Sequence, residues 1–287
     1  MNLSEKKYIF DGEVVTASQI VSIAFSNRAF RFGDSLFETI RYSNKNILFL
    51  PEHISRLKLS MPILKMKIPS HFSFDYFLNK ISEVIYANHL QDKSARIRLT
   101  VFRQGSGAYY PESNEVSYLI EADELPNALY QMPANGLVVD IFKDIFKPIN
   151  RLSNLKSGNA LIYVLASINK DALRLDDSLI LNEKGHICEA SASNIFAVKG
   201  NMMMTPPLTE GCVSGIMRMQ IKKMAESKKM LYIEKPFTPH TLLDADEVFI
   251  TNTIQGAQWI RQFQSRIYEK KNITQMIVEQ LNEIIMQ

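Results

Sequence analysis

The sequence predicts an α+β fold in two domains rather than a doubly wound parallel sheet. Segments that form β-hairpins outnumber strand–helix–strand units, and a polar stretch with two prolines, residues 121–135, interrupts the chain near its middle. Because a doubly wound sheet needs a crossover helix between successive strands, the excess of hairpins favours the α+β class. We therefore expect a smaller α+β domain over residues 1–122, a linker over residues 123–134 and a larger domain over residues 135–287.

The expected smaller domain contains two hairpins, two helices and a further strand pair. An Asp-Gly pair at positions 11–12 lies between two apolar segments, and residues 43–46 form a second turn. Apolar residues then recur at helical spacing from position 54 to position 64, which predicts an amphipathic helix with His53 and Arg56 one turn apart. A second helix is expected over residues 74–90, and two paired strands over residues 95–107 and 116–122.

The expected larger domain begins with a strand and ends with a helix. Asn272 is expected to be the N-cap of that last helix. In chain order, the expected elements are a strand over residues 136–142, a helix starting near Lys156, a β-rich stretch over 178–204, a helix over 214–229, strands over 231–237 and 246–252, and the terminal helix from residue 272.

Composition and charge argue against several classes of function. Hydrophobic residues make up 46% of the 287 residues and charged residues 22%, as in ordinary globular proteins of one or two domains. The net charge of +3 shows no basic cluster, and there is neither a leader-like N-terminus nor an apolar run long enough for a bilayer. Cys188 and Cys212 form no C-x-x-C pair, and the five histidines have no metal-ligand spacing. We therefore expect a cytoplasmic protein without a metal, a nucleic-acid partner or a membrane.

A lysine at the head of an apolar helix is the first candidate for chemistry. The apolar residues of this helix fall on one stripe, which we expect to be buried: Ala160, Leu161, Val164, Leu165 and Ile168. A buried ammonium is costly unless its charge is used or removed, and partial desolvation makes a lysine amine a nucleophile for aldehydes. The alternative is that Lys156 points into water.

Three further segments have residues that suit an aromatic ligand bearing an anion. Glu189 precedes four small residues, 190–193, which let a flat ring approach while the carboxylate binds a protonated ring nitrogen; an exposed strand glutamate is the alternative. The glycine-bearing loop of residues 209–218 leads into a helix whose N-terminus suits an anion, although a plain helix start has the same pattern. Residues 249–257 place hydroxyls at the end of a strand, where Asn and Thr are also common turn residues.

In order and together, these segments resemble the class IV (fold type IV) pyridoxal-phosphate aminotransferases. This family includes branched-chain aminotransferases, D-amino-acid aminotransferases and aminodeoxychorismate lyases. The matching segments are FRFGDSLFETIR (30–41), PEHISRL (51–57), LKSGNALIYVLA (155–166), CEASASNIF (188–196), GCVSGIMR (211–218) and ADEVFITNT (245–253). The resemblance implies a two-domain fold like that of D-amino-acid aminotransferase, with pyridoxal 5'-phosphate bound between the domains. It also implies a homodimer in which a loop of each subunit closes the other's site.

Carried over position by position, the resemblance assigns roles toward the cofactor. Lys156 takes the Schiff-base role, and Glu189 pairs with the pyridinium nitrogen and keeps it protonated. The phosphate ligands that it implies are Arg56 in the family's H-x-x-R-L pattern, the backbone amides of Val213 and Ser214, and the hydroxyl of Thr253.

The resemblance also assigns residues to the substrate. Arg98 stands near the position where branched-chain enzymes place an arginine for the substrate carboxylate, and Arg96 and Arg103 are weaker candidates. Phe37 implies an apolar wall opposite that arginine.

Departures from the family pattern bear on the reaction. Ala160 stands where branched-chain enzymes carry a tyrosine. D-amino-acid enzymes have a tyrosine at the position of Phe37 and an Arg-x-His in the following loop, which residues 105–111 lack. GIMR and ITN are similar to the aminodeoxychorismate lyases, whereas FETIR is shared by several subfamilies.

The function that we expect is transfer of an amino group between an L-amino acid, hydrophobic or branched-chain, and a 2-keto acid such as 2-oxoglutarate. The alternative is a 4-amino-4-deoxychorismate lyase that forms 4-aminobenzoate and pyruvate. A binding protein on this fold is a third possibility, which predicts loss of Lys156 or Glu189, and both are present.

Overall fold

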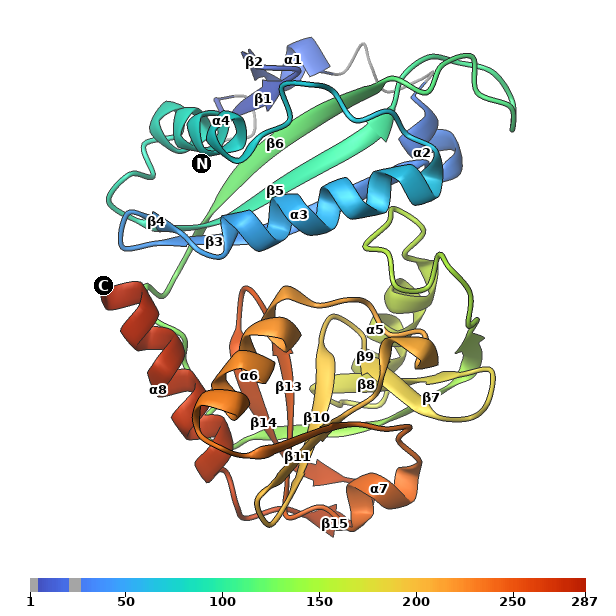
Figure 1. Cartoon of the computed structure of the whole chain (residues 1–287), viewed down its shortest axis with the longest axis vertical. Helices are drawn as coiled ribbons and strands as arrows, with labels where there is room; N and C mark the ends of the chain where they lie inside the picture. The colour runs from blue at the N-terminus through green and yellow to red at the C-terminus, as the bar shows by residue number, and fades with distance from the viewer. Residues whose placement is uncertain (1–4, 21–26) are drawn as a thin grey trace. The chain divides into compact units, whose positions relative to one another are not determined.

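The computed structural model describes residues 5–20 and 27–287, which divide into two compact units (Figure 1). The first unit contains the described residues up to Leu129 together with Lys156–Asn159. The second unit contains Tyr130–Leu155 and Ala160–Gln287. Lys156 therefore groups with the first unit, although the helix that follows it belongs to the second.

A six-stranded antiparallel sheet forms the centre of the first unit. Its strand order is β2-β1-β6-β5-β3-β4, and every neighbouring pair is antiparallel. The elements of this unit are β1 (Lys7–Phe10), β2 (Glu13–Thr16), α1 (Ala17–Ile20), α2 (Arg28–Phe32), β3 (Ser35–Ser43), β4 (Asn46–Ile47), α3 (Leu50–Ser60), the 3-10 helix η2 (Met61–Leu64), α4 (Phe74–Ala87), β5 (Ser94–Arg103) and β6 (Val116–Leu125).

Both predicted hairpins of this unit are confirmed. In the β1–β2 turn, Asp11 and Gly12 have φ angles of 47° and 96°. In the β3–β4 turn, Asn44 and Lys45 have φ angles of 49° and 63°. Two left-handed residues in sequence match the twist of antiparallel strands, and Asp-Gly and Asn adopt that conformation at low cost. Local turn chemistry therefore sets the pairing of these strands.

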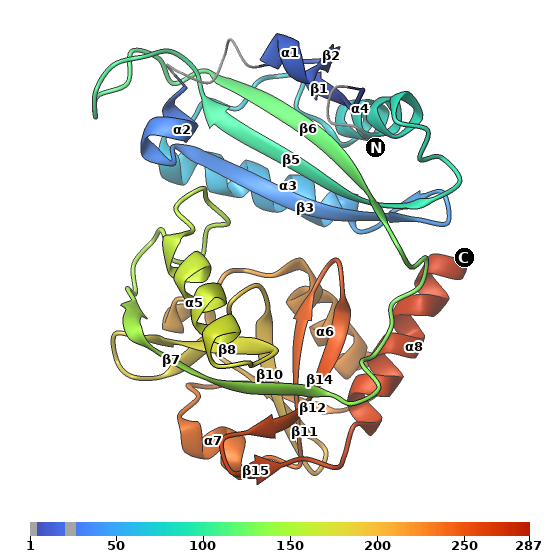
Figure 2. The same ribbon diagram turned by 180° about the vertical axis from the view of Figure 1, so that it is seen from behind.

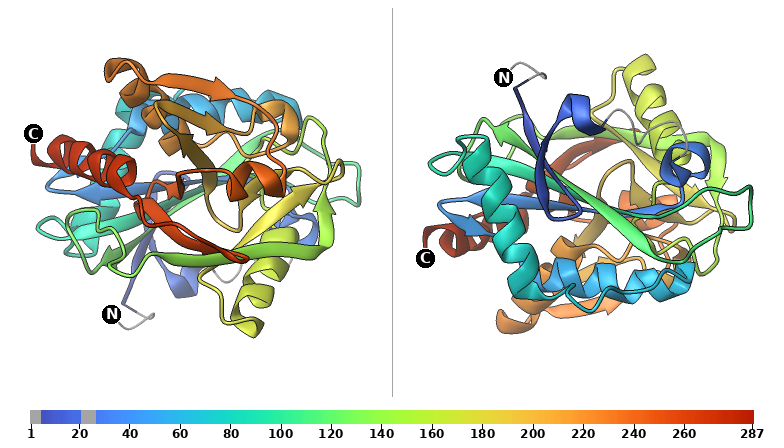
Figure 3. Two further views of the ribbon diagram at one scale, coloured as in Figure 1. Left: turned by 90° about the horizontal axis from the view of Figure 1, so that it is seen from below. Right: turned by 90° about the horizontal axis from the view of Figure 1, so that it is seen from above.

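The two predicted helices of the first unit are also confirmed, and they cover the same face of the sheet (Figures 1 and 2). α4 begins after the N-cap Ser73, whose Oγ accepts the Tyr76 N–H at 3.1 Å. Its inward residues are Phe77, Ile81, Val84 and Ile85. One end of α4 meets α3, as the view from above shows (Figure 3). On this face of the sheet, α3 therefore packs against β3, and α4 packs against β1 and β6.

The second unit is built on a nine-stranded mixed sheet. Its strand order is β12-β11-β10-β13-β14-β7-β8-β9, with β15 paired to β14. The pairs β11–β12, β14–β7 and β7–β8 are parallel, and the others are antiparallel. The elements are β7 (Leu137–Lys147), α5 (Leu161–Ala172), β8 (Asp177–Asn182), β9 (Ile187–Ala190), β10 (Asn194–Lys199), β11 (Met202–Thr205), the 3-10 helix η3 (Leu208–Glu210), α6 (Ile216–Ser227), β12 (Leu231–Glu234), α7 (Pro239–Leu243), β13 (Glu247–Asn252), β14 (Gly256–Phe263), β15 (Arg266–Ile267) and α8 (Asn272–Met286).

Apolar side chains from neighbouring strands form the core of this unit. Leu179, Ile195, Val248, Ile260 and Phe263 are completely buried in one cluster. Each such side chain contributes about 1.5–3 kcal/mol by leaving water. This core fixes the ends of β9 and β13, from which the candidate site residues of the second unit extend.

The helix after Lys156 corrects two expectations. α5 begins at Leu161, so Lys156 precedes the helix by five residues instead of heading it. The apolar stripe expected to be buried is exposed: Leu161 is 76% exposed and Ile168 is 61% exposed. The helix packs on β7 and β8 through its opposite face, where Ala166 is completely buried. Because α5 is apolar on both faces, periodicity could not decide which face meets the sheet.

The N-terminus of α8 is a third correction. Asn272 is the first helical residue, and Lys271 occupies the cap position without a side-chain cap bond. The buried carboxylate of Glu247 on β13 caps the helix instead, because it accepts the N–H groups of Ile273 at 3.1 Å and Thr274 at 2.6 Å. A tertiary contact therefore replaces the predicted local cap. α8 has 15 residues, and within residues 5–20 and 27–287 no helix combines the length and the apolar content needed to cross a membrane.

Candidate active site

Backbone pairing with β3 places Lys156 in the first unit. Ser157 forms an isolated antiparallel bridge with Leu36, and the Phe37 N–H donates to the Lys156 carbonyl at 2.9 Å. A Cβ on Gly158 would lie 2.3 Å from the Ser35 Oγ, so only glycine permits this approach. The Lys-Ser-Gly sequence is thus explained by strand-like pairing rather than by the start of a helix.

Phe37 brings two cationic side chains together on the face of β3 away from α3. The Lys156 Nζ lies 4.3 Å from the centroid of its ring, and the Arg98 guanidinium carbon lies 3.8 Å from the same centroid. Arg98 extends from β5, is 39% exposed, and has Glu121 Oε1 3.7 Å from its Nε. Burial lowers the pKa of Arg98, although a guanidinium stays charged at any pH of interest. The first unit therefore holds an amine and a guanidinium at one apolar surface.

The opposite face of β3 carries a buried ionic cluster that we call the Glu38 cluster, formed by Glu38, His53 and Arg56. Strand alternation turns Glu38 toward α3, which supplies the other two residues. Glu38 Oε1 accepts the Arg56 Nε–H at 2.9 Å, and Oε2 accepts Nη2–H from the same guanidinium. Oε2 also accepts from the His53 Nδ1 at 2.6 Å.

The charges of the Glu38 cluster follow from these contacts. Burial alone would raise the pKa of Glu38, but the charge of Arg56 and the hydrogen bond from His53 outweigh it and hold the pKa at about 2. Burial lowers the pKa of His53, and the charges of Arg56 and Lys156 act in the same direction against Glu38. At neutral pH the cluster therefore contains a carboxylate, a guanidinium and a neutral imidazole that donates from Nδ1.

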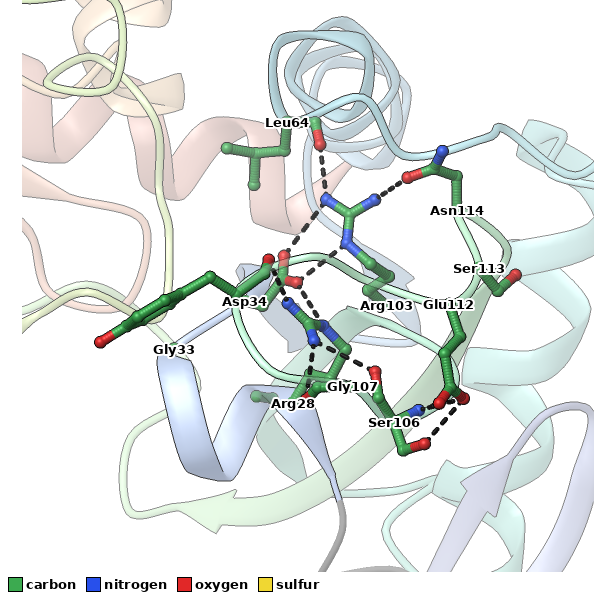
Figure 4. Close-up of polar contacts among 12 residues, drawn as sticks. Arg28, Gly33, Asp34, Leu64, Arg103, Ser106, Gly107, Glu112, Ser113 and Asn114 are labelled. Atoms are coloured by element: carbon green, nitrogen blue, oxygen red, sulfur yellow. Dashed lines mark hydrogen bonds and ion pairs between the residues drawn. The ribbon is translucent and has the colours of Figure 1, made fainter.

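The other two predicted substrate arginines have different surroundings. Arg96 is half exposed and pairs with Asp123 at 3.0 Å. Arg103 is buried, and Figure 4 shows Asp34 between the guanidinium groups of Arg103 and Arg28. Arg103 also donates to the carbonyl of Leu64 at 2.5 Å. Because its N–H groups bind these protein partners, Arg103 has its hydrogen bonds inside the first unit and is a poorer carboxylate ligand than Arg98.

The same ionic group braces the loop between β5 and β6. The Arg28 guanidinium donates to the carbonyl oxygen of Ser106 at 3.2 Å (Figure 4). It also donates to the carbonyl oxygens of Ala108 at 2.7 Å and Tyr109 at 3.3 Å. Tyr109 itself is 90% exposed. A buried arginine therefore holds the backbone of a loop whose aromatic side chain faces solvent.

The second unit contains another buried ionic group, which we call the Glu189 cluster: Glu189, Lys147, Tyr163 and the Val213 N–H. Glu189 Oε1 accepts from Lys147 Nζ and from the Tyr163 hydroxyl, the latter at 2.7 Å. Lys147 also donates to the Tyr163 oxygen at 2.7 Å. Glu189 Oε2 accepts the Val213 N–H at 2.8 Å. Burial and the neighbouring carboxylate raise the pKa of Tyr163 far above its usual range, so its hydroxyl remains a donor.

The backbone amides predicted to bind phosphate are used elsewhere. The Val213 N–H donates to Glu189, and the Ser214 N–H donates to the Asn154 carbonyl at 3.2 Å. An N–H group has one proton to donate, so neither amide is available to an anion in this arrangement. Their role as phosphate ligands therefore stays a prediction, which requires that both amides exchange these partners. The helix begins two residues later than expected, and its own first N–H groups are the ones without intrahelical partners.

The start of α6 has the features of an anion-binding site. Gly215 is the N-cap of this 12-residue helix and provides no side-chain cap. A Cβ at Gly215 would lie 1.8 Å from Asn194 Oδ1, so the backbone must be bare here. Asn194 pairs with Thr251 across β10 and β13, and the buried Thr251 Oγ1 has no hydrogen-bond partner among residues 5–20 and 27–287. Thr253 is half-buried near the end of β13, where its carbonyl accepts from the Tyr130 hydroxyl at 2.9 Å.

In the part of the chain that the structure describes, no group of three or more His, Cys, Asp or Glu side chains could hold a metal ion.

The predicted site residues fall into two groups, one in each unit. The first unit contains Lys156, Phe37, Arg56, Arg96, Arg98 and Arg103, and the second contains Glu189, Val213, Ser214 and Thr253.

Sequence reasoning missed Glu38, Lys147 and Tyr163. Glu38 stands within an apolar strand segment, and Lys147 ends another. An ionisable residue in a segment predicted to be buried requires a partner, and this was the available signal. The identity of each partner depends on tertiary contacts between elements far apart in sequence.

Comparison with known proteins identifies the family. The family model described as Amino-transferase class IV matches residues 35–263. A provisionally named branched-chain-amino-acid aminotransferase of Methanocaldococcus jannaschii is 28% identical over 259 residues, which is 88% of each chain. A D-alanine aminotransferase of Bacillus licheniformis is 26% identical over 252 residues, covering 86% of this chain and 84% of that protein.

Solved structures confirm the predicted α+β fold of this family. The crystal structure of a branched-chain amino acid aminotransferase from Thermobaculum terrenum, in its pyridoxal-phosphate form, matches with a TM-score of 0.86. The match covers 99% of this chain and 95% of that one at 19% identity, so it is a likeness of fold. The family match over most of the chain, together with this fold, shows that the chain belongs to the class IV aminotransferases, a family of enzymes.

Proposed function

We propose that the chain is a pyridoxal-phosphate-dependent transaminase that moves an amino group between a hydrophobic or branched-chain L-amino acid and a 2-keto acid such as 2-oxoglutarate. The observation that supports this most is the placement of the Lys156 amine and the Arg98 guanidinium against the same Phe37 ring. A nucleophilic amine, a carboxylate-binding cation and an apolar wall are what such a substrate requires.

The residues of the second unit fit the cofactor. Glu189 Oε2 accepts one N–H and keeps a second lone pair, which suits a protonated ring nitrogen. The bare backbone at Gly215 and the unpartnered Thr251 hydroxyl suit a phosphate at the start of α6. We assign the phosphate to Arg56, the first N–H groups of α6 and the nearby threonine hydroxyls, with Thr253 among them.

When bound, pyridoxal 5'-phosphate supplies a ring that withdraws electrons from the α-carbon of the substrate. Lys156 would hold the cofactor covalently through its amine until the amino group of the substrate displaces that amine, and the freed amine would then take and return the proton of the α-carbon. Glu189 would hold the proton on the ring nitrogen, and the hydrogen bonds from Lys147 and Tyr163 keep the Glu189 carboxyl group in one orientation.

The substrate pocket determines which amino acids react. Arg98 binds the substrate carboxylate, and Phe37 forms an apolar wall beside it. Arg96 is a weaker candidate for the same carboxylate because it pairs with Asp123. An apolar wall distinguishes side chains by only about 1–3 kcal/mol per methylene, so several hydrophobic L-amino acids should be accepted.

We propose a homodimer that acts in the cytoplasm. The exposed apolar stripe of α5, with Leu161 at 76% and Ile168 at 61% exposed, supports association with a second copy. Free thiols at Cys188 and Cys212 are consistent with a reducing compartment. Sedimentation of the purified enzyme tests the dimer.

Two experiments test the proposed reaction. Borohydride reduction of the holoenzyme followed by peptide mass spectrometry should place the cofactor on Lys156, and modification of Lys147 instead would overturn the assignment. Leucine, valine, isoleucine and D-alanine are then compared as amino donors to 2-oxoglutarate, beside release of 4-aminobenzoate from 4-amino-4-deoxychorismate. We expect the branched-chain L-amino acids to have the highest kcat/KM. A far higher kcat/KM for 4-aminobenzoate release would establish the lyase instead.

A further inference from the structure

The Glu38 cluster contains two residues to which the proposed function gives no role. We propose that Glu38 and His53 are positioning residues that fix the guanidinium plane of Arg56, so that its outer edge binds the phosphate of the cofactor. This inference rests on the phosphate-binding role proposed for Arg56 and deepens it.

Glu38 binds one edge of the Arg56 guanidinium. The two hydrogen bonds, from Nε to Oε1 at 2.9 Å and from Nη2 to Oε2, join two planar groups side by side. A pair of parallel bonds sets both the plane and the rotation of a guanidinium, which a single bond does not. The edge that carries Nη1 therefore points in one direction relative to α3.

His53 in turn fixes Glu38. The imidazole is completely buried and donates from Nδ1 to Oε2 at 2.6 Å. Its second nitrogen, Nε2, is buried without a hydrogen-bond partner among residues 5–20 and 27–287. An unsatisfied buried nitrogen is destabilising, and an apolar side chain would avoid it. The polar contribution of His53 to the cluster is therefore the N–H that it donates to Glu38.

The hydrogen bond from His53 adds no charge. Burial lowers the pKa of His53, so the ring is neutral at the pH at which the enzyme would work. Replacing His53 therefore changes the orientation of Glu38 and Arg56 and leaves the net charge near the phosphate unchanged. Replacing Glu38 removes a negative charge near the phosphate as well, so its two effects oppose each other. Variants of His53 consequently give the cleaner test.

A set of three His53 variants isolates the Nδ1 donor. In His53→Asn, the amide nitrogen falls close to the position of Nδ1 and can donate to Glu38. His53→Leu removes the donor, and His53→Gln places its amide nitrogen near the position of Nε2. Arg56→Ala tests the phosphate role itself. Glu115→Gln, at an exposed ion pair with Lys67 in the same unit, is the control.

The measurements are the dissociation constant of pyridoxal 5'-phosphate from the apoenzyme and the phosphorus NMR signal of the bound cofactor between pH 5 and pH 9. We expect Arg56→Ala to weaken binding roughly 100-fold and His53→Leu or His53→Gln roughly tenfold, as for lost hydrogen bonds to charged groups. His53→Asn should stay within about threefold of the parent. A phosphate held by an oriented guanidinium stays dianionic across this range, whereas in His53→Leu its titration should move toward about pH 6.

The outcomes separate the inference from the proposed function. If Arg56→Ala binds the cofactor as the parent does, the role of Arg56 is wrong and the positioning role falls with it. If Arg56→Ala weakens binding but the His53 variants leave affinity and the phosphorus titration unchanged, only the positioning role is overturned. Equal weakening in His53→Asn and His53→Leu would also overturn it, because packing alone would then explain the effect. If His53→Leu does not fold, His53→Gln decides.

Discussion

Because Glu38 is ionised in the fold, the free energy of unfolding should fall as the pH drops into the acid range. The substitution Glu38→Gln should remove this contribution. In the fold, burial raises the pKa of Glu38, but Arg56 and His53 outweigh it and lower the pKa from its ordinary value of 4.5 to about 2. A group whose pKa is lower in the folded state stabilises the fold above its unfolded pKa. That stabilisation is lost as the pH falls from about 4.5 through about 2.

The magnitude follows from the two pKa values. At about 1.4 kcal/mol for each pH unit, a change from 4.5 to about 2 corresponds to about 3 kcal/mol of unfolding free energy. Glu38 is 2% exposed, so solvent screening does not reduce this value much. Glu38→Gln keeps the shape of the side chain and removes the charge. We expect it to destabilise the protein by about 3 kcal/mol at pH 7 and by much less near pH 2.5.

Urea unfolding followed by circular dichroism, at pH 7, 4.5 and 2.5, measures this difference between parent and variant. Glu115→Gln is the matched control, since its carboxylate is 48% exposed in an ion pair with Lys67 and should contribute at most about 1 kcal/mol at any of these pH values. A gap between the parent and Glu38→Gln that is the same at pH 7 and pH 2.5 would show that ionised Glu38 does not stabilise the fold, and would refute the reasoning.

Three other substitutions test separate contacts. Arg28→Met should speed chymotrypsin cleavage after Tyr109 several-fold, because the loop loses the hydrogen bonds from the buried guanidinium. Arg31→Met, at an exposed arginine of the same helix, is the control, and equal cleavage of the two variants would contradict this prediction. Gly215→Ala should lower the unfolding free energy by about 1–3 kcal/mol through the clash with Asn194, and an unchanged stability would show that the helix start can move. Tyr163→Phe should cost about 1.5–3 kcal/mol in the same urea assay, and a neutral effect would mean that the Glu189 cluster closes without the hydroxyl.

Local chemistry in the sequence was sufficient for many of the elements. The Asp-Gly turn after Phe10 and the Ser73 cap act within four residues of where they stand, so a sequence window contains all that determines them. Alternation likewise predicted β5 and its partner β6, because in a strand with one buried face every second residue is apolar.

Longer-range effects explain the elements that were missed or misread. β14 (Gly256–Phe263) was not predicted because Gln258 and Arg261 interrupt its apolar pattern. Gln258 is nevertheless buried, since its amide donates to the Gln131 carbonyl at 2.8 Å. The face of α5 that meets the sheet was misread for the same kind of reason, because only the neighbouring strands decide between two apolar faces.

The candidate site shows the same division. Residue types and family resemblance pointed to Lys156 and Glu189, whose positions along the chain are recognisable in short segments. The hydrogen bonds that the amides of Val213 and Ser214 make here could not be predicted, because their partners, Glu189 and Asn154, lie far away in sequence. A glycine-bearing loop thus predicts that a helix N-terminus is present, whereas the first N–H group that is free depends on the contacts of the loop.

The Glu38 and Glu189 clusters share one arrangement, although they belong to different units. In each, a buried carboxylate is held by a cation and by a neutral hydrogen-bond donor: Arg56 and His53 in the first unit, Lys147 and Tyr163 in the second. For Glu38, burial alone would raise the pKa, and the charge of Arg56 outweighs burial and keeps the carboxylate ionised. The neutral donor adds a further hydrogen bond to the carboxylate without changing the charge of the cluster. Substitution of a neutral donor should therefore change the geometry of its cluster alone, whereas substitution of a cation changes both geometry and charge. For this reason the neutral donors, His53 and Tyr163, are the informative positions to replace.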